Sequence, residues 1–261
     1  MNRLPTLFVS HGSPMLAIED SPASRFLRGL GNSIPRPRAI LMASAHWESQ
    51  GSIAVNLAER PETIHDFGGF PLELYRLDYP APGAPEVAEK AASLLEQAGY
   101  RVVHSASRGL DHGAWVPLRL MYPDAGIPVT QISIMRGATP AEHEQIGRAL
   151  ASLREDDVLV IGSGSLTHNL YEFRGGPIDA PAPEWVSEFA TWMEAKLHAG
   201  DRAALLDYRS LAPSAVRNHP TEEHLLPLYV AMGAAGADVV AERIHSSNEY
   251  GVLAMDVYAF R

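Results

Sequence analysis

The sequence of 261 residues contains no cysteine. This absence excludes disulfide bonds, cysteine-ligated zinc or iron–sulfur sites and a cysteine nucleophile, and it favours a cytoplasmic protein. Long apolar runs are also missing, since no stretch approaches the ~18 residues of a membrane span. The first apolar run is too short for a signal peptide. We therefore expect neither a membrane partner nor a secretory route.

The sequence has fewer basic than acidic residues. The chain has 21 Lys and Arg against 31 Asp and Glu, a net charge of −10. Because nucleic-acid binding needs clustered Lys and Arg, no nucleic-acid partner is expected. The length allows one large domain or two small ones. Since neither a linker nor a repeat of fixed period is visible, we predict a single domain over residues 1–261; the oligomeric state, monomer or small homo-oligomer, stays open.

Histidine is abundant, and three of the eleven histidines follow apolar runs. His11, His46 and His168 come directly or shortly after runs at 5–10, 38–45 and 157–161. Such continuous apolar runs are typical of strands buried on both faces of a parallel sheet. Ligands bind at the carboxyl ends of parallel strands, and three imidazoles are enough to hold a catalytic zinc or iron ion. The pattern predicts a histidine cluster at that edge, although any one of these histidines taken alone is more often a core residue.

The rest of the chain alternates between strand and helix patterns. Further strands are predicted at 51–56, 101–104, 128–134 and 252–259. Helices are predicted at 21–30, 84–98, 141–153, 184–199, 202–211 and 220–232, with another entered from a loop at 108–118. A loop at 57–83 is long enough to be functional, and its aromatic residues argue against disorder. We therefore predict an α/β fold with a mostly parallel central sheet, flanked by helices, and a metal site at the carboxyl ends of the strands.

A second group of histidines lies near the predicted helix 220–232. His219 and His224 are five residues apart, which separates them by ~140° on a regular helix, so both cannot bind one metal from the same helix. We expect His219 at the cap and His224 in the first turns. Glu222 and Glu223 either stabilise the helix N-terminus or supply one carboxylate ligand.

Two loop histidines stand beside acidic residues. His65 precedes Asp66, and His112 follows Asp111. An adjacent carboxylate can orient an imidazole or raise its pKa; the alternative is a solvated loop histidine. The remaining histidines lack such a setting and are expected at the surface: His104, His143, His198 and His245.

The stretch Gly162-Ser163-Gly164-Ser165-Leu166-Thr167 fits no common motif. It lacks the third glycine of the dinucleotide fingerprint, and it is not the Gly-x-Ser-x-Gly of serine hydrolases. Nucleotide binding and serine nucleophile chemistry are therefore not predicted.

Seven motifs occur in order over nearly the whole chain: His11-Gly12-Ser13-Pro14, Ser44-Ala45-His46-Trp47, Thr63-Ile64-His65-Asp66-Phe67-Gly68-Gly69-Phe70-Pro71, Tyr79-Pro80-Ala81-Pro82-Gly83, Asp111-His112-Gly113-Ala114-Trp115, His168-Asn169-Leu170 and Glu223-His224-Leu225-Leu226-Pro227-Leu228. Each motif is weak alone, but the ordered set resembles the 4,5-DOPA extradiol dioxygenase group of the class III extradiol ring-cleaving dioxygenases.

The resemblance implies an activity and a site. It implies that His11, His46 and His224 bind one divalent metal, which is Fe(II) for activity, although three neutral imidazoles also suit Zn(II). His168 is the implied acid/base catalyst next to the metal. His65 and His112 are implied to line the substrate pocket, with His112 also among the catalytic residues. The implied substrates are a small aromatic diol and O2, and the product is a ring-opened semialdehyde.

Two other functions fit the same histidines. A zinc hydrolase would use metal-bound water as its nucleophile and would need no O2. A non-catalytic binding protein on the same fold would lack the metal, or its spectrum would not respond to a catechol. Metal content and oxygen dependence separate the three.

Overall fold

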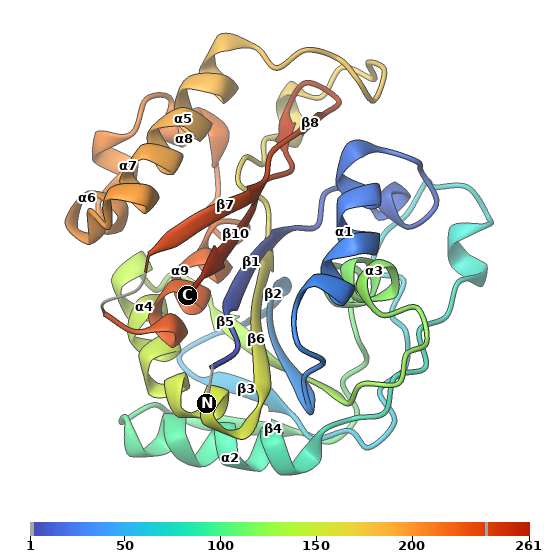
Figure 1. Ribbon diagram of the computed structural model, residues 1–261, viewed down its shortest axis with the longest axis vertical. Helices are drawn as coiled ribbons and strands as arrows, with labels where there is room; N and C mark the ends of the chain where they lie inside the picture. The colour runs from blue at the N-terminus through green and yellow to red at the C-terminus, as the bar shows by residue number, and fades with distance from the viewer. Residues whose placement is uncertain (1–2, 238–239) are drawn as a thin grey trace.

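The computed structural model describes residues 3–237 and 240–261, which form one α/β domain around a central sheet (Figure 1). The strands are β1 (Thr6–Ser10), β2 (Ala39–Ser49), β3 (Ile53–Asn56), β4 (Val102–Ser105), β5 (Val129–Met135), β6 (Val158–Gly164), β7 (Ala241–His245), β8 (Asn248–Glu249), β9 (Leu253–Ala254) and β10 (Val257–Phe260). The sheet has the order β4-β3-β5-β2-β6-β1-β10-β7 in the described residues, and β8 pairs with β9. The four central strands β5, β2, β6 and β1 are parallel. This confirms the predicted fold class.

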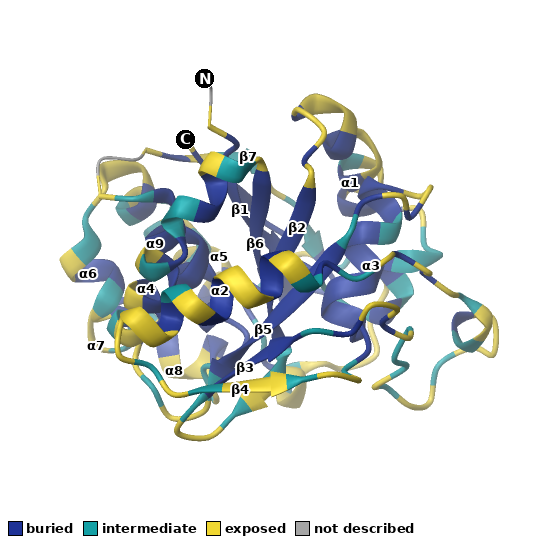
Figure 2. Ribbon diagram, turned by 90° about the horizontal axis from the view of Figure 1, so that it is seen from below, coloured by how far each residue is buried: buried dark blue, intermediate teal, exposed yellow. Residues whose placement is uncertain are grey.

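Helices cover both faces of the sheet (Figures 1 and 2). They are α1 (Pro22–Ser33), α2 (Pro85–Gln97), α3 (His112–Met121), α4 (Pro140–Ala149), α5 (Glu184–Ala199), α6 (Arg202–Leu206), α7 (Tyr208–Leu211), α8 (Ala215–Asn218) and α9 (Leu226–Ala235). Short 3-10 helices are η1 (Pro14–Ala17), η2 (Leu74–Arg76), η3 (Ala151–Asp156) and η4 (Leu170–Glu172). No helix in the described ranges is both long and apolar enough to cross a membrane.

Strand β2 shows why the central runs are apolar throughout. Ile40 and Met42 face a core that includes α1 and α3. Leu41 and Ala43 face a second core that includes α2 and α4. Because successive side chains point to opposite faces of a sheet, a strand covered on both sides needs no polar residue. Burial on both faces was the prediction for these runs, and it is confirmed.

Several boundaries differ from the predictions. Strand β2 continues to Ser49, and its pairing with β5 shifts between Ser44 and Glu48. Helix α9 begins at Leu226, where Pro227 occupies its first turn; proline is favoured there, so the expected start at 220 was wrong. The predicted strand 252–259 is divided between β9 and β10, the helix 202–211 is divided between α6 and α7, and β7 was missed.

Candidate metal centre

Three histidines from distant parts of the chain meet at the carboxyl edge of the sheet. His11 follows β1 directly, His46 lies within β2, and His224 lies in the turn before α9. One ligand-type atom from each lies within 4.8 Å of the others. Nε2 of His11 is 3.0 Å from Nε2 of His46. This separation suits two nitrogens on one ion, since metal–nitrogen bonds are about 2.0–2.1 Å for zinc.

His46 reaches this edge through an irregularity in β2. Ser44 pairs with Ser133 of β5, and the next paired residue is Glu48, opposite Ile134. The intervening residues have no partners on β5, as in a bulge. Bulges re-aim side chains next to active sites. His46 was predicted to follow a strand that ended at 45; it lies instead inside a longer strand whose bulge turns its ring toward His11.

Each of the three rings presents one nitrogen to an oxygen acceptor. The Nδ1 partners are Ser163 Oγ at 3.0 Å for His11, Glu223 Oε1 at 2.9 Å for His224 and Asp66 Oδ2 at 3.7 Å for His46. Such outer contacts orient metal-binding histidines. Nε2 of His224 is buried and has no hydrogen-bond partner in the described part of the chain. An unpartnered buried nitrogen is unfavourable, and a metal ion would satisfy it.

The protonation of the three rings also suits a metal. Burial, followed by the neighbouring imidazoles, holds the pKa values of His11 and His224 well below the ordinary 6.5. Burial, again followed by an adjacent imidazole, lowers the pKa of His46 to about 4. All three are therefore neutral near pH 7, as metal ligands must be. The three-histidine cluster contains no carboxylate, and Glu223 forms part of a second group with His168 and His224.

His168 stacks on His224. The ring centroids are 3.4 Å apart and the planes are inclined by 9°. Burial lowers the pKa of His168 to about 4, opposed by Glu223. His168 is therefore neutral near pH 7, like the three clustered histidines. His168 thus lies beside the three-histidine cluster rather than in it.

Asp66 bonds to His112, the histidine from the other loop. Its Oδ1 accepts hydrogen bonds from the backbone N of His112 at 2.9 Å and from the ring Nδ1 at 3.0 Å. The ring of His112 lies 3.9 Å from that of His46, centroid to centroid. Asp111 instead accepts from Ser44, at 2.6 Å, and from Gln131, at 3.0 Å. For His65 and His112, therefore, the acid that is adjacent in sequence is not the group that orients the ring.

His65 belongs to an aromatic wall formed by residues of the loop 57–83 and by Trp115 of α3. Its Nε2 is 3.1 Å from the carbonyl oxygen of Leu77. Its ring packs near Phe67, Tyr75 and Trp115, with centroid distances between 5.7 and 5.9 Å. Phe67 in turn lies 5.7 Å from His112. The wall therefore extends from His65 to the edge of the histidine cluster.

His219 and Glu222 do not join the cluster. His219 is fully buried, and its Nε2 is 2.8 Å from the carbonyl oxygen of Leu166. Glu222 accepts a hydrogen bond from the hydroxyl of Tyr208 at 2.8 Å. The expectation that His224 lies inside a helix is wrong, because α9 starts two residues later.

Two of the four histidines assigned to the surface are not there. His143 is fully buried on α4; its Nε2 accepts from the backbone N of Met135 and its Nδ1 donates to the carbonyl of Thr139. His245 is half-buried and stacks on Phe26 at 4.6 Å. His104 and His198 are exposed, as predicted.

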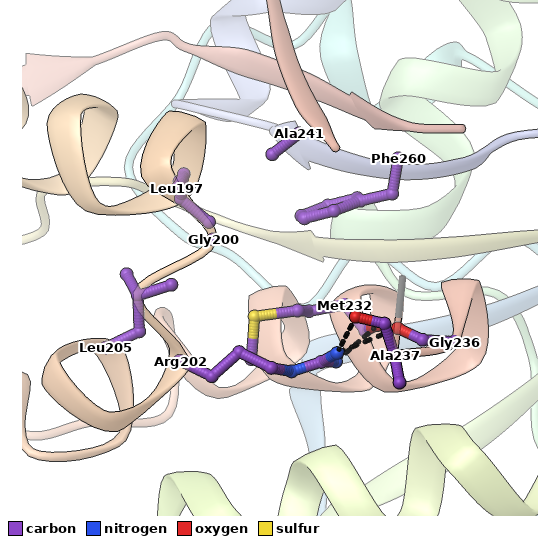
Figure 3. A pocket seen from close by; sticks show the side chains of 9 residues that line it. All are labelled: Leu197, Gly200, Arg202, Leu205, Met232, Gly236, Ala237, Ala241 and Phe260. Carbon is purple, nitrogen blue, oxygen red and sulfur yellow. Dashed lines mark hydrogen bonds between the residues drawn. The ribbon is translucent and has the colours of Figure 1, made fainter. Parts of the chain in front are cut away.

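A small cavity on another part of the molecule lies beside Arg202 (Figure 3). Its volume is about 30 Å³. Arg202 donates to the carbonyl oxygens of Gly236 and Ala237, both at 2.9 Å, at the C-terminal end of α9. A cation at this end of a helix satisfies free carbonyl groups. The cavity is therefore a structural feature of the helix end, and none of the clustered histidines lines it.

The fold and this centre define a class: an α/β protein whose histidine cluster, at the carboxyl edge of a parallel sheet, is able to hold one metal ion. Residues 5–260 match the family model described as the catalytic LigB subunit of aromatic ring-opening dioxygenase. A 4,5-DOPA dioxygenase extradiol from Beta vulgaris is 45% identical over 98% of this chain and 96% of its own. One from Escherichia coli K12 is 40% identical over 89% of this chain and 85% of its own.

A solved structure has the same fold. The crystal structure of an uncharacterized protein from Escherichia coli K12 superposes with a TM-score of 0.83 at 33% identity, covering 99% of this chain and 100% of that one. The chain belongs to the LigB family of metal-dependent, extradiol aromatic ring-opening dioxygenases. The predicted family, enzyme class and activity are thereby confirmed.

Proposed function

We propose that His11, His46 and His224 hold one divalent metal and that the enzyme opens the ring of a small DOPA-like catechol with O2. The observation that supports this most is the gathering of three neutral imidazoles around one point, with Nε2 of His224 buried and unpartnered in the described chain. Fe(II) is the proposed working metal because ring opening by O2 needs a redox-active ion. The same three nitrogens also suit Zn(II).

The metal and the protein have separate tasks. A bound Fe(II) would lower the pKa of the catechol hydroxyls and provide the redox chemistry with O2. His168, which stacks beside His224, is the proposed acid/base group: it would take a proton from a substrate hydroxyl and later donate it as the ring opens.

His112 is proposed to contact the substrate. Its Nδ1 donates to Asp66, which leaves Nε2 as the ring nitrogen that can contact a substrate. That nitrogen therefore fits a substrate hydroxyl. His65 and Phe67 lie on the adjoining aromatic wall, where an aromatic ring packs favourably edge to face or offset.

The substrate class comes from the relatives. Proteins from Beta vulgaris, Mirabilis jalapa and Escherichia coli that resemble this chain carry the name 4,5-DOPA dioxygenase extradiol. We propose L-DOPA or a simpler catechol with one side chain as the substrate. A cytoplasmic location and the absence of a nucleic-acid partner stay predictions from composition.

The test is oxygen uptake by protein loaded anaerobically with Fe(II), with L-DOPA and simpler catechols as substrates. A yellow semialdehyde should form, with one O2 consumed per ring opened. Turnover that needs no O2 would support the hydrolase instead. The His168→Ala variant should keep its metal and lose most turnover, whereas the exposed His198→Ala variant should keep both. Loss of metal from His168→Ala would contradict its place outside the metal's ligands.

A further inference from the structure

We propose that Ser163 is a positioning residue that fixes the tautomer of His11. Pro117 makes this possible because, lacking an N–H, it leaves the backbone carbonyl of Gly113 available to accept a hydrogen bond from Ser163. This inference rests on the metal-binding role proposed for His11. Ser163 lies in the Gly-Ser-Gly stretch at the end of β6, which neither a nucleotide site nor a serine nucleophile explains.

The hydroxyl of Ser163 has two partners and one hydrogen. The side chain is fully buried, and Oγ is 2.5 Å from the carbonyl oxygen of Gly113 and 3.0 Å from Nδ1 of His11. A carbonyl oxygen can only accept, so Ser163 donates its hydrogen to Gly113. Oγ is then left to accept from His11, whose Nδ1 must carry the hydrogen.

The tautomer of His11 determines whether its other ring nitrogen, Nε2, can bind a metal. A neutral imidazole carries one hydrogen, so protonation of Nδ1 leaves a lone pair on Nε2 of His11. That is the atom 3.0 Å from Nε2 of His46, inside the three-histidine cluster. The opposite tautomer would direct an N–H into the place of the metal.

Pro117 explains why the Gly113 carbonyl is available. In an α-helix the carbonyl of residue 113 accepts from the N–H of residue 117. Residue 117 is a proline inside α3, and proline has no N–H. The carbonyl oxygen of Gly113 therefore lacks its usual helical donor, and the hydroxyl of Ser163 takes that place.

Gly113 allows the helix to come this close. A Cβ atom on residue 113 would lie 2.5 Å from Oγ of Ser44 and 3.0 Å from Cδ2 of His46. The first turn of α3 thus packs directly on the bulge that carries His46. A single hydrogen-bonded series then runs from α3 through Ser163 to His11.

Metal-free wild-type protein offers the first test. Long-range proton–nitrogen correlation spectra of the histidine rings distinguish the two tautomers, and comparison with His11→Gln assigns the ring. We expect hydrogen on Nδ1 of His11. Hydrogen on Nε2 would overturn the proposal, whether or not the protein binds metal.

Variants offer the second test, with Zn(II) affinity measured by chelator competition. Ser163→Ala should bind about 10- to 100-fold more weakly, as is typical when an outer hydrogen bond to a metal ligand is lost. Ser163→Thr keeps a hydroxyl and should regain most of this affinity together with the Nδ1 hydrogen. Ser24→Ala, at a buried serine of α1 whose hydroxyl bonds only to the backbone of Ser21, should bind like wild type.

The Pro117→Ala variant tests separately whether the missing N–H in α3 keeps the Gly113 carbonyl available to Ser163. It supplies an N–H that competes for the Gly113 carbonyl, so we expect a smaller loss of Zn(II) affinity and a mixture of His11 tautomers. Unchanged affinity and tautomer would overturn the role of Pro117. Wild-type affinity in Ser163→Ala would overturn that of Ser163. A wild-type protein that binds no metal would instead contradict the proposed function, while the tautomer measurement would still decide this inference.

Discussion

Oδ1 of Asp66 accepts two hydrogen bonds from His112, one from its backbone N and one from its ring. The pair joins the long loop 57–83 to the first residue of α3. Burial raises the pKa of Asp66, but the hydrogen bonds and charge of His112 outweigh it and bring the pKa to about 2. Asp66 is therefore ionised at every pH at which the enzyme would work, and its two hydrogen bonds orient the ring of His112 so that Nε2 is the nitrogen left for a substrate.

Replacement of this carboxylate tests the pair. Asp66→Asn keeps the shape but removes the charge, so the ring of His112 should lose its fixed orientation. We expect kcat to fall about 10- to 100-fold with metal content unchanged. Asp78→Asn is the control, because Asp78 accepts a hydrogen bond from Thr63 elsewhere in the loop. If Asp66→Asn also loses metal, Asp66 acts mainly through His46, 3.7 Å from its other oxygen.

Gly164 controls the position of His224. A Cβ on residue 164 would lie 2.0 Å from the carbonyl oxygen of His224. The backbone N of Ser165, the next residue in the chain, donates a hydrogen bond to that same oxygen. Gly164→Ala should destabilise the protein by about 3 kcal/mol through overpacking and weaken Zn(II) binding. Urea unfolding and chelator competition measure the two effects.

Gly29→Ala is the matched control for that change. Its Cβ would meet no atom within 4 Å, and alanine in a helix is favoured over glycine by roughly 0.5–1 kcal/mol. We expect a small gain in stability and no change in metal affinity. Equal stability of the two variants would contradict the close approach at Gly164.

Metal binding should stabilise the fold, because the three histidines come together only in the folded chain. Free metal at 100 times its dissociation constant should raise the free energy of unfolding by about 2.7 kcal/mol, and a chelator should reverse the gain in Tm. His224→Ala removes the nitrogen that lacks a partner and should abolish most of the gain. The exposed His198→Ala should respond like wild type.

The buried His143 should make the metal-free protein sensitive to acid. Burial lowers its pKa below 6.5, opposed by its hydrogen bond to Thr139. The unfolded chain therefore binds a proton more readily, and stability falls as the pH drops below about 6.5. One such proton contributes a slope of about 1.4 kcal/mol per pH unit.

Urea unfolding of metal-free protein at pH 7.5 and 5.5 measures this slope. His143→Gln should lose part of the acid sensitivity, although it is also less stable at pH 7.5 because the backbone N of Met135 depends on Nε2. His104→Gln, at an exposed position on β4, should retain the wild-type slope. An unchanged slope in His143→Gln would show that its proton uptake does not differ between the folded and unfolded chains.

The sequence predicted which segments form the central strands and that histidines gather at the carboxyl edge of the sheet. Apolar runs before His11 and His168 predicted buried parallel strands, because strands covered on both faces exclude polar side chains. The bulge in β2 was not readable, since no local signal shows that the residues between Ser44 and Glu48 lack partners. The start of α9 was misplaced because two prolines, Pro220 and Pro227, gave the same helix-start signal.

The sequence by itself determined the kinds of ligand available, the strands that deliver His11 and His168, and, through the ordered motifs, the family. Only the tertiary structure decided which groups form hydrogen bonds with these histidines. His11 depends on Ser163 and His112 on Asp66, in each case across segments far apart in the chain. Hydrogen bonds depend on distance and direction in space, so adjacency in sequence predicted Asp111 for His112 where the folded chain supplies Asp66.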